Sequence, residues 1–104
     1  MKLFNVVDIH VGGGEPWPMR VFHETPEFTM RVIDLPPGGS IAPCEMASRV
    51  VFVCLAGEVS VSVDGEDAML SSGAGLVSGP ATLSMRTASG ARLLGIQIAP
   101  AGGA

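Results

Sequence analysis

The sequence is poor in the residues on which several protein classes depend. It has no Tyr, two His and two Cys, and its six Lys and Arg face ten Asp and Glu, for a net charge of −4. A nucleic-acid surface needs clustered Lys and Arg, which six scattered cations do not supply. Two cysteines, Cys44 and Cys54, do not make the disulfide framework of a small secreted domain. We therefore expect no nucleic-acid partner and a reducing, cytoplasmic setting.

Long apolar stretches are also missing. A membrane span needs about 20 consecutive apolar residues. The uncharged stretch 69–85 is interrupted by Gly73, Gly79 and Pro80, and the N-terminal residues meet a carboxylate at Asp8. The sequence therefore predicts no membrane partner and no signal peptide.

What the chain does have is period-two alternation between turn signals. Val59, Val61 and Val63 alternate with small or polar residues, which indicates a strand with one buried face. Asp64-Gly65 has the composition of a tight hairpin turn, and the segment 36–40 (Pro-Pro-Gly-Gly-Ser) cannot continue a strand. With 104 residues and 47% hydrophobic content, this pattern predicts one all-β domain of nine or ten short strands, a sandwich or a barrel.

Two motif frames add a family resemblance. Gly38, then Cys44-Glu45-Met46, Val50 and Gly57 have the spacing of the first motif of a small single-domain cupin. Gly73, followed by the segment 79–84, resembles the second motif. The resemblance implies an all-β, single-domain cupin-type double-stranded β-helix, a jelly-roll β-barrel. It also implies a homodimer, because such barrels commonly pair through an edge strand or the N-terminal segment.

The resemblance divides the chain into three parts within one domain, 1–104. Residues 28–100 form the expected barrel core. Residues 1–27 hold N-terminal strands and an irregular Pro/Gly segment, and residues 101–104 form a frayed tail. Trp17 lies between two prolines in the irregular segment. It has two interpretations, a lid over the barrel mouth or a dimer contact.

The usual cupin metal is held by three imidazoles and one carboxylate. The resemblance puts Cys44, Met46, Val50 and Ser84 (or, in a shifted frame, Met85) at those positions. Mn²⁺, Fe²⁺ and Ni²⁺ prefer imidazole and carboxylate ligands, so we expect no such metal and no cofactor. The alternative is a soft site for Cu(I), which thiolate and thioethers suit, formed by Cys44, Met46 and Met85.

An apolar pocket follows from the replaced ligands, and the favoured function is binding or sensing of a small molecule. The side chains expected to line that pocket are Met30, Cys44, Met46, Val50, Phe52, Cys54 and Ser84. A metal-dependent enzyme with the soft ligand set remains an alternative. Another is a metal-independent isomerase or cyclase in which His23 or Glu45 transfers a proton. A structural module with a closed interior is a fourth possibility.

The cysteines and arginines carry further open interpretations. Cys44 could act as a reactive thiol, although it lacks a nearby His in the sequence. A Cys44–Cys54 disulfide is disfavoured in a cytoplasmic setting. Arg31, Arg86 and Arg92 are either solvated charges or the anchor of an anionic ligand.

Overall fold

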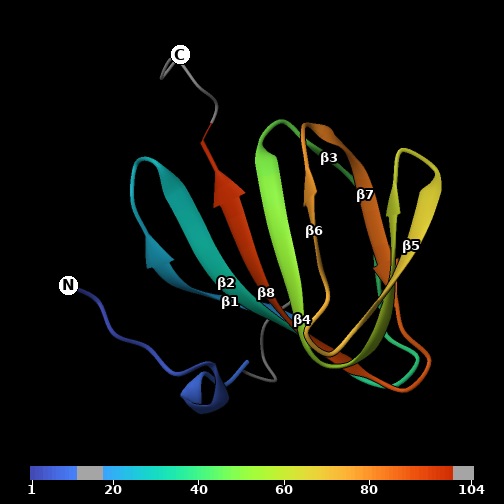
Figure 1. Ribbon diagram of the computed structural model, residues 1–104, viewed down its shortest axis with the longest axis horizontal. Coiled ribbons are helices and arrows are strands. Elements are labelled where there is room, and N and C mark those ends of the chain that lie inside the picture. Colours follow the sequence, from blue (N-terminus) through green and yellow to red (C-terminus); the bar gives the residue numbers. More distant parts are fainter. Residues whose placement is uncertain (12–17, 100–104) are drawn as a thin grey trace.

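Eight antiparallel strands form the part of the chain that the structure, a computed structural model, describes: residues 1–11 and 18–99 (Figure 1). The strands are β1 (Met19–Glu24), β2 (Phe28–Leu35), β3 (Ser40–Met46), β4 (Arg49–Val63), β5 (Glu66–Ser71), β6 (Gly75–Ser78), β7 (Ala81–Arg86) and β8 (Ala91–Ile98). A 3₁₀ turn, η1 (Val6–Asp8), precedes them. The all-β prediction is confirmed, and no helix in these residues is long and apolar enough to cross a membrane.

The strand count falls short of the predicted nine or ten because β4 runs unbroken for 15 residues. Its first half pairs with β8 and β6, and its second half pairs with β5 and β7. The pairing of β4 with β8 has a register shift between Cys54 and Ala56 and ends at Gly57, which has φ +78°, and pairing with β5 begins at Glu58. A bulge of this kind bends a strand, so one long strand contributes to both layers and lowers the total count.

The sheet curls into two facing layers. Its order is β1-β2-β8-β4-β7-β3, with β5 and β6 also paired to β4. In Figure 1, β1, β2 and β8 lie beside the first half of β4, and β7, β3 and β5 lie by its second half. The core fills the space between the layers; Val50, Val59, Val61 and Leu93 are each at most 1% exposed. This alternate burial along the strands is the pattern from which they were predicted.

The turns follow their predicted chemistry. Asp64 and Gly65 connect β4 to β5 with φ angles of +49° and +85°. Two successive positive φ angles are typical of the type I′ hairpin turn, whose twist matches that of the flanking strands. The Asp64 carboxylate also accepts a hydrogen bond of 2.8 Å from the Thr82 amide, which ties this turn to the start of β7.

The N-terminal segment contacts β1 and β8. Arg92 donates to the carbonyl oxygens of Val6 and Ile9 and pairs with Asp34 at 3.1 Å. Phe4 packs on Phe22 of β1, with ring centroids 4.8 Å apart. The outer face of β2 is buried as well, since Val32 is 0% exposed, and this leads to an error in the predicted pocket described below.

Candidate functional site

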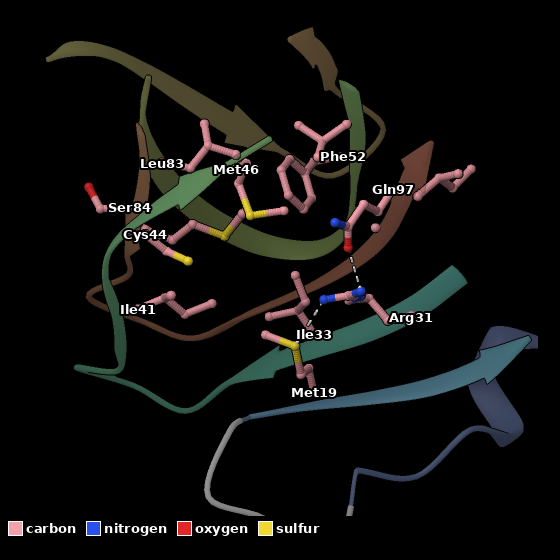
Figure 2. A pocket seen from close by; sticks show the side chains of 14 residues that line it. Met19, Arg31, Ile33, Ile41, Cys44, Met46, Phe52, Leu83, Ser84 and Gln97 are labelled. Carbon is pink, nitrogen blue, oxygen red and sulfur yellow. Dashed lines mark hydrogen bonds between the residues drawn. The ribbon is translucent and has the colours of Figure 1, made fainter. Parts of the chain in front are cut away.

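A pocket of about 290 Å³ opens between the two layers. Its walls come from β1, β2, β3, β4, β7 and β8, and most of the side chains are apolar or carry sulfur (Figure 2). The lining residues are Met19, Arg31, Ile33, Ile41, Cys44, Met46, Val50, Phe52, Leu83, Ser84, Met85, Gly95, Ile96 and Gln97. Five of the seven residues predicted to line a pocket are among them: Cys44, Met46, Val50, Phe52 and Ser84.

Met30 is the first of two exceptions, because β2 has the opposite phase from the one predicted. Arg31 and Ile33 line the pocket, so Met30 and Val32 lie on the other face of the strand. Val32 is 0% exposed because that outer face is also covered. Both faces of β2 carry apolar residues, and the alternation was assigned to the wrong face at Met30.

Cys54 is the second exception. It shares the inner face of β4 with Val50 and Phe52 but belongs to the closed core, with 1% of its surface exposed. Its thiol lies 3.4 Å from the Ala56 carbonyl oxygen and 3.5 Å from that of Gly57. Burial raises the pKa of this thiol, partly offset by the hydrogen bond to Ala56. Cys54 is therefore a protonated core residue.

The pocket has one polar corner, formed by Arg31 and Gln97. Arg31 Nη2 donates to Gln97 Oε1 at 2.8 Å, and Nη1 lies 3.6 Å from the Met19 sulfur (Figure 2). Gln97 Nε2 in turn lies 3.4 Å from the Ser48 hydroxyl. A network of side chains from β1, β2, β8 and the β3–β4 connection thus orients the guanidinium along the pocket wall.

Gly95 has no side chain, and this leaves space for the Arg31 side chain in the polar corner. A Cβ at this position would lie 3.1 Å from Phe52 Cε1 and 3.4 Å from Arg31 Cγ. The missing side chain lets the Phe52 ring and the stem of Arg31 pack side by side on the wall. Burial lowers the pKa of Arg31, partly opposed by the charge of Glu24. The guanidinium therefore sits in a poorly solvated place.

The candidate acid–base residues lie away from the pocket. His23 pairs with Met30 in the β1–β2 register and packs on Phe28, with ring centroids 5.7 Å apart. Glu45 is exposed on β3 and does not line the pocket, although its neighbour Cys44 does. His23 and Glu45 are therefore not placed to transfer a proton to a molecule bound in this pocket. Trp17 lies outside the described residues, so its two interpretations stay open.

The structure also places the cysteines and the three arginines whose roles the sequence left open. Cys44 and Cys54 are both free thiols, and Cys44 is exposed, which places it at the rim of the pocket. Of the three arginines considered for an anion, Arg31 lines the pocket. Arg86 is exposed at the end of β7, and Arg92 is engaged by Asp34 and the N-terminal segment.

Solved structures share this architecture, whereas no protein-family profile and no curated protein sequence matches the chain. An RmlC-like cupin protein from Desulfovibrio desulfuricans superposes with a TM-score of 0.79 at 20% identity, over 94% of this chain and 96% of that one. The protein TT1209 from Thermus thermophilus gives 0.78 at 24% identity, over 94% and 97%. The chain has the cupin fold.

One of the similar solved structures is an enzyme. A G106A mutant of salicylate 1,2-dioxygenase from Pseudoaminobacter salicylatoxidans, in complex with gentisate, matches with a TM-score of 0.67 at 20% identity. The match covers 70% of this chain and 20% of the dioxygenase. At these identities the likeness concerns the fold, and function has to be argued from the site itself.

The positions that the cupin motifs assign to metal ligands come together in the pocket. Cys44, Met46, Val50, Ser84 and Met85 all line it. They carry one thiol, two thioethers, a hydroxyl and an isopropyl group. Among residues 1–11 and 18–99, no three His, Cys, Asp or Glu side chains group closely enough to hold a metal ion. This donor set does not fit a hard or borderline divalent metal.

Around the polar corner, sequence reasoning missed Gln97 and Met19 and left Arg31 undecided, and it also did not name Ile33, Ile41, Leu83, Gly95 and Ile96. The signal for Arg31 was present in β2. Ile33 and Leu35 share its phase and are each 2% exposed. Gln97 shares the phase of the buried Leu93 on β8. No comparable sequence signal marks Met19, whose place follows from its pairing with Ile33.

Proposed function

We propose that this chain is a small-molecule binding or sensing cupin domain that lacks the usual His/Glu metal site. The observation that carries the proposal is the pocket of about 290 Å³ with walls from six strands and no His, Asp or Glu among its described lining residues. A closed structural module would fill this space with side chains. An open, largely apolar cavity with a few convergent polar groups is typical of a ligand site.

The apolar wall supplies the driving force for binding. Transfer of apolar surface from water contributes roughly 25 cal/mol per Å². The pocket residues lie on paired strands, so the ligand would meet a preformed wall and little ordering entropy would oppose binding. Phe52 and Leu83, which are 7% and 5% exposed, are held in place by the core cluster around them.

Binding of neutral probes tests the proposal without reference to charge. Octan-1-ol and benzyl alcohol are titrated while amide resonances of the pocket strands are followed by NMR. Cys44→Trp places a large side chain in the pocket, and Glu45→Trp adds the same side chain to the adjacent, exposed position of β3. We expect C44W to abolish binding and E45W to retain it. Equal binding by both variants, or no binding by the wild-type chain, would contradict the proposal.

A second candidate function rests on the sulfur atoms of the same pocket. Cys44, Met46, Met85 and Met19 give the pocket four sulfur-bearing side chains. Thiolate and thioethers are soft ligands suited to Cu(I), whose redox chemistry would support a metal-dependent enzyme. Cu(I) competition against bicinchoninate tests this candidate. Stoichiometric binding that disappears in Cys44→Ala would favour it over the metal-free proposal, and absence of binding would exclude it.

The proposal includes a cytoplasmic homodimer with no nucleic-acid or membrane partner. Pairing of two barrels would protect an exposed strand edge, and β3 forms one end of the main strand order. Light scattering coupled to size exclusion measures the mass directly. A mass equal to one 10.7 kDa chain at all concentrations tested would exclude the homodimer.

A further inference from the structure

Arg31 places a positive charge inside a pocket that is otherwise apolar. The guanidinium has five N–H groups and always carries its charge near neutral pH. The side chain is half-buried, and its Nε atom is fully buried with no hydrogen-bond partner in the described part of the chain. Burying a cation away from water costs free energy unless hydrogen bonds and an opposite charge compensate it.

The described chain compensates this charge only in part. Within residues 1–11 and 18–99, the single ion pair joins Arg92 to Asp34, so no carboxylate lies within 4 Å of Arg31. Glu24 acts on Arg31 through space from the exposed end of β1. The neutral amide of Gln97 supplies one good acceptor, whereas the Met19 sulfur facing Nη1 is a weak one. One more acceptor, with a negative charge, would complete the site.

We propose that the ligand of this pocket is a small molecule with one carboxylate and an apolar body. The carboxylate would bind the Nη edge of Arg31 in place of the Met19 sulfur, and the apolar body would lie against Phe52 and Leu83. The inference rests on the proposed binding function and adds the chemical class of the ligand. Guanidinium matches a carboxylate in plane and charge, and the flexible Met19 side chain can move aside.

The charge of the pocket selects a carboxylate over a phosphate ester. Arg31 is the only cation among the described residues that line the pocket. A phosphate monoester carries a charge of about −1.5 to −2 at neutral pH. It would therefore bring uncompensated negative charge into a poorly solvated site, whereas one carboxylate balances one guanidinium.

Three ligands of equal chain length test the inference by isothermal titration calorimetry: octanoate, octan-1-ol and octyl phosphate. A hydrogen bond to a charged group contributes about 1.5–3 kcal/mol, so we expect octanoate to bind at least about tenfold more tightly than octan-1-ol. Octanoate binding should weaken as the pH falls through the pKa of its own carboxyl group, and octan-1-ol binding should not. Octyl phosphate should bind more weakly than octanoate.

Variants assign the preference to Arg31. In Arg31→Met the affinity for octanoate should fall to that for octan-1-ol, and retained octan-1-ol binding shows that the pocket is still folded. Arg31→Lys keeps the charge without the planar fork and should give an intermediate affinity. Arg86→Met removes an exposed arginine and serves as the matched control, with no expected change.

The outcomes separate the two proposals. Equal affinities for octanoate and octan-1-ol, or an octanoate preference that survives in R31M, would overturn the carboxylate inference and leave the binding function standing. Tighter binding of octyl phosphate would overturn the inference in the same way. Failure of all three ligands to bind would overturn both.

Discussion

Gly57 allows a quantitative test of how β4 serves both layers of the barrel. The residue follows the register shift of β4 and has φ +78°. A Cβ at this position would overlap the Gly90 carbonyl oxygen and lie 3.0 Å from Ala91 Cα. Both neighbours are backbone atoms at the start of β8, which cannot rotate away as a side chain could. Substitution should therefore force β4 and β8 apart at the point where the layers separate.

The magnitude follows from two separate costs. A positive φ costs an L-residue about 1–2 kcal/mol, of which about 0.4–1 kcal/mol is regained by restricting the unfolded chain. Overpacking against a fixed neighbour adds about 1–3 kcal/mol. Gly57→Ala should thus lose about 2–4 kcal/mol of unfolding free energy. At about 4–8 °C per kcal/mol, its Tm should fall by about 10 °C or more.

Gly65→Ala is the matched control. Gly65 has φ +85°, but a Cβ added there would meet no atom within 4 Å. Its replacement carries the φ cost alone and should lose about 1 kcal/mol. Urea unfolding of both variants, followed by circular dichroism, isolates the steric contribution as the difference. If G57A is no less stable than G65A, the backbone contact with Gly90 does not constrain the bend of β4, and this account of the fold is wrong.

Four further predictions concern a buried hydroxyl, the two thiols and the N-terminal segment. Thr87→Val removes a buried hydroxyl that donates at 2.6 Å to one carbonyl oxygen and accepts from one amide, so urea unfolding should show a loss of about 1–3 kcal/mol. Iodoacetamide should label Cys44 in the folded protein and Cys54 only after unfolding, as read by mass spectrometry; equal rates would contradict the burial of Cys54. Because burial raises the pKa of the Cys54 thiol, the unfolded thiol ionises first as the pH rises above its pKa of about 8.5. The free energy of unfolding should therefore fall above that pH, and it should fall less in Cys54→Ala, as measured by urea unfolding at several pH values. Arg92→Gln should speed proteolysis within residues 1–11, and unchanged cleavage would refute the anchoring of that segment.

The sequence predicted most of the fold because the strands and turns are local features. Two examples depend on residues close together in the sequence: the alternation at Val59, Val61 and Val63, and the positive-φ pair Asp64-Gly65. The motif glycine at 57 also has a physical reason in its positive φ and its contact with β8. The strand count failed where the chain bends without breaking its hydrogen bonding, because a bulge inside β4 has no reliable local signal.

The site was harder to predict because it depends on which face of a strand meets which layer. Cys44, Met46 and Ser84 were placed through the motif frame, and they do line one pocket. Arg31 was not decided, since β2 is buried on both faces and carries apolar residues in both phases. Cys54 has the right phase but lies in the closed core, a distinction that needs coordinates.

The polar corner formed by Arg31 and Gln97 indicates that this part of the interior has a functional role and does not only pack the core. An apolar side chain at position 31 would avoid the partial desolvation of a guanidinium that no carboxylate of the described residues pairs within 4 Å. Gly95, which is unfavourable in a strand interior, leaves the space that the Arg31 stem and the Phe52 ring occupy. Two positions that both reduce stability thus cooperate to hold one cation at the wall of an open cavity. Departures of this kind from good packing are expected at functional sites, where binding provides the compensation that the folded chain lacks.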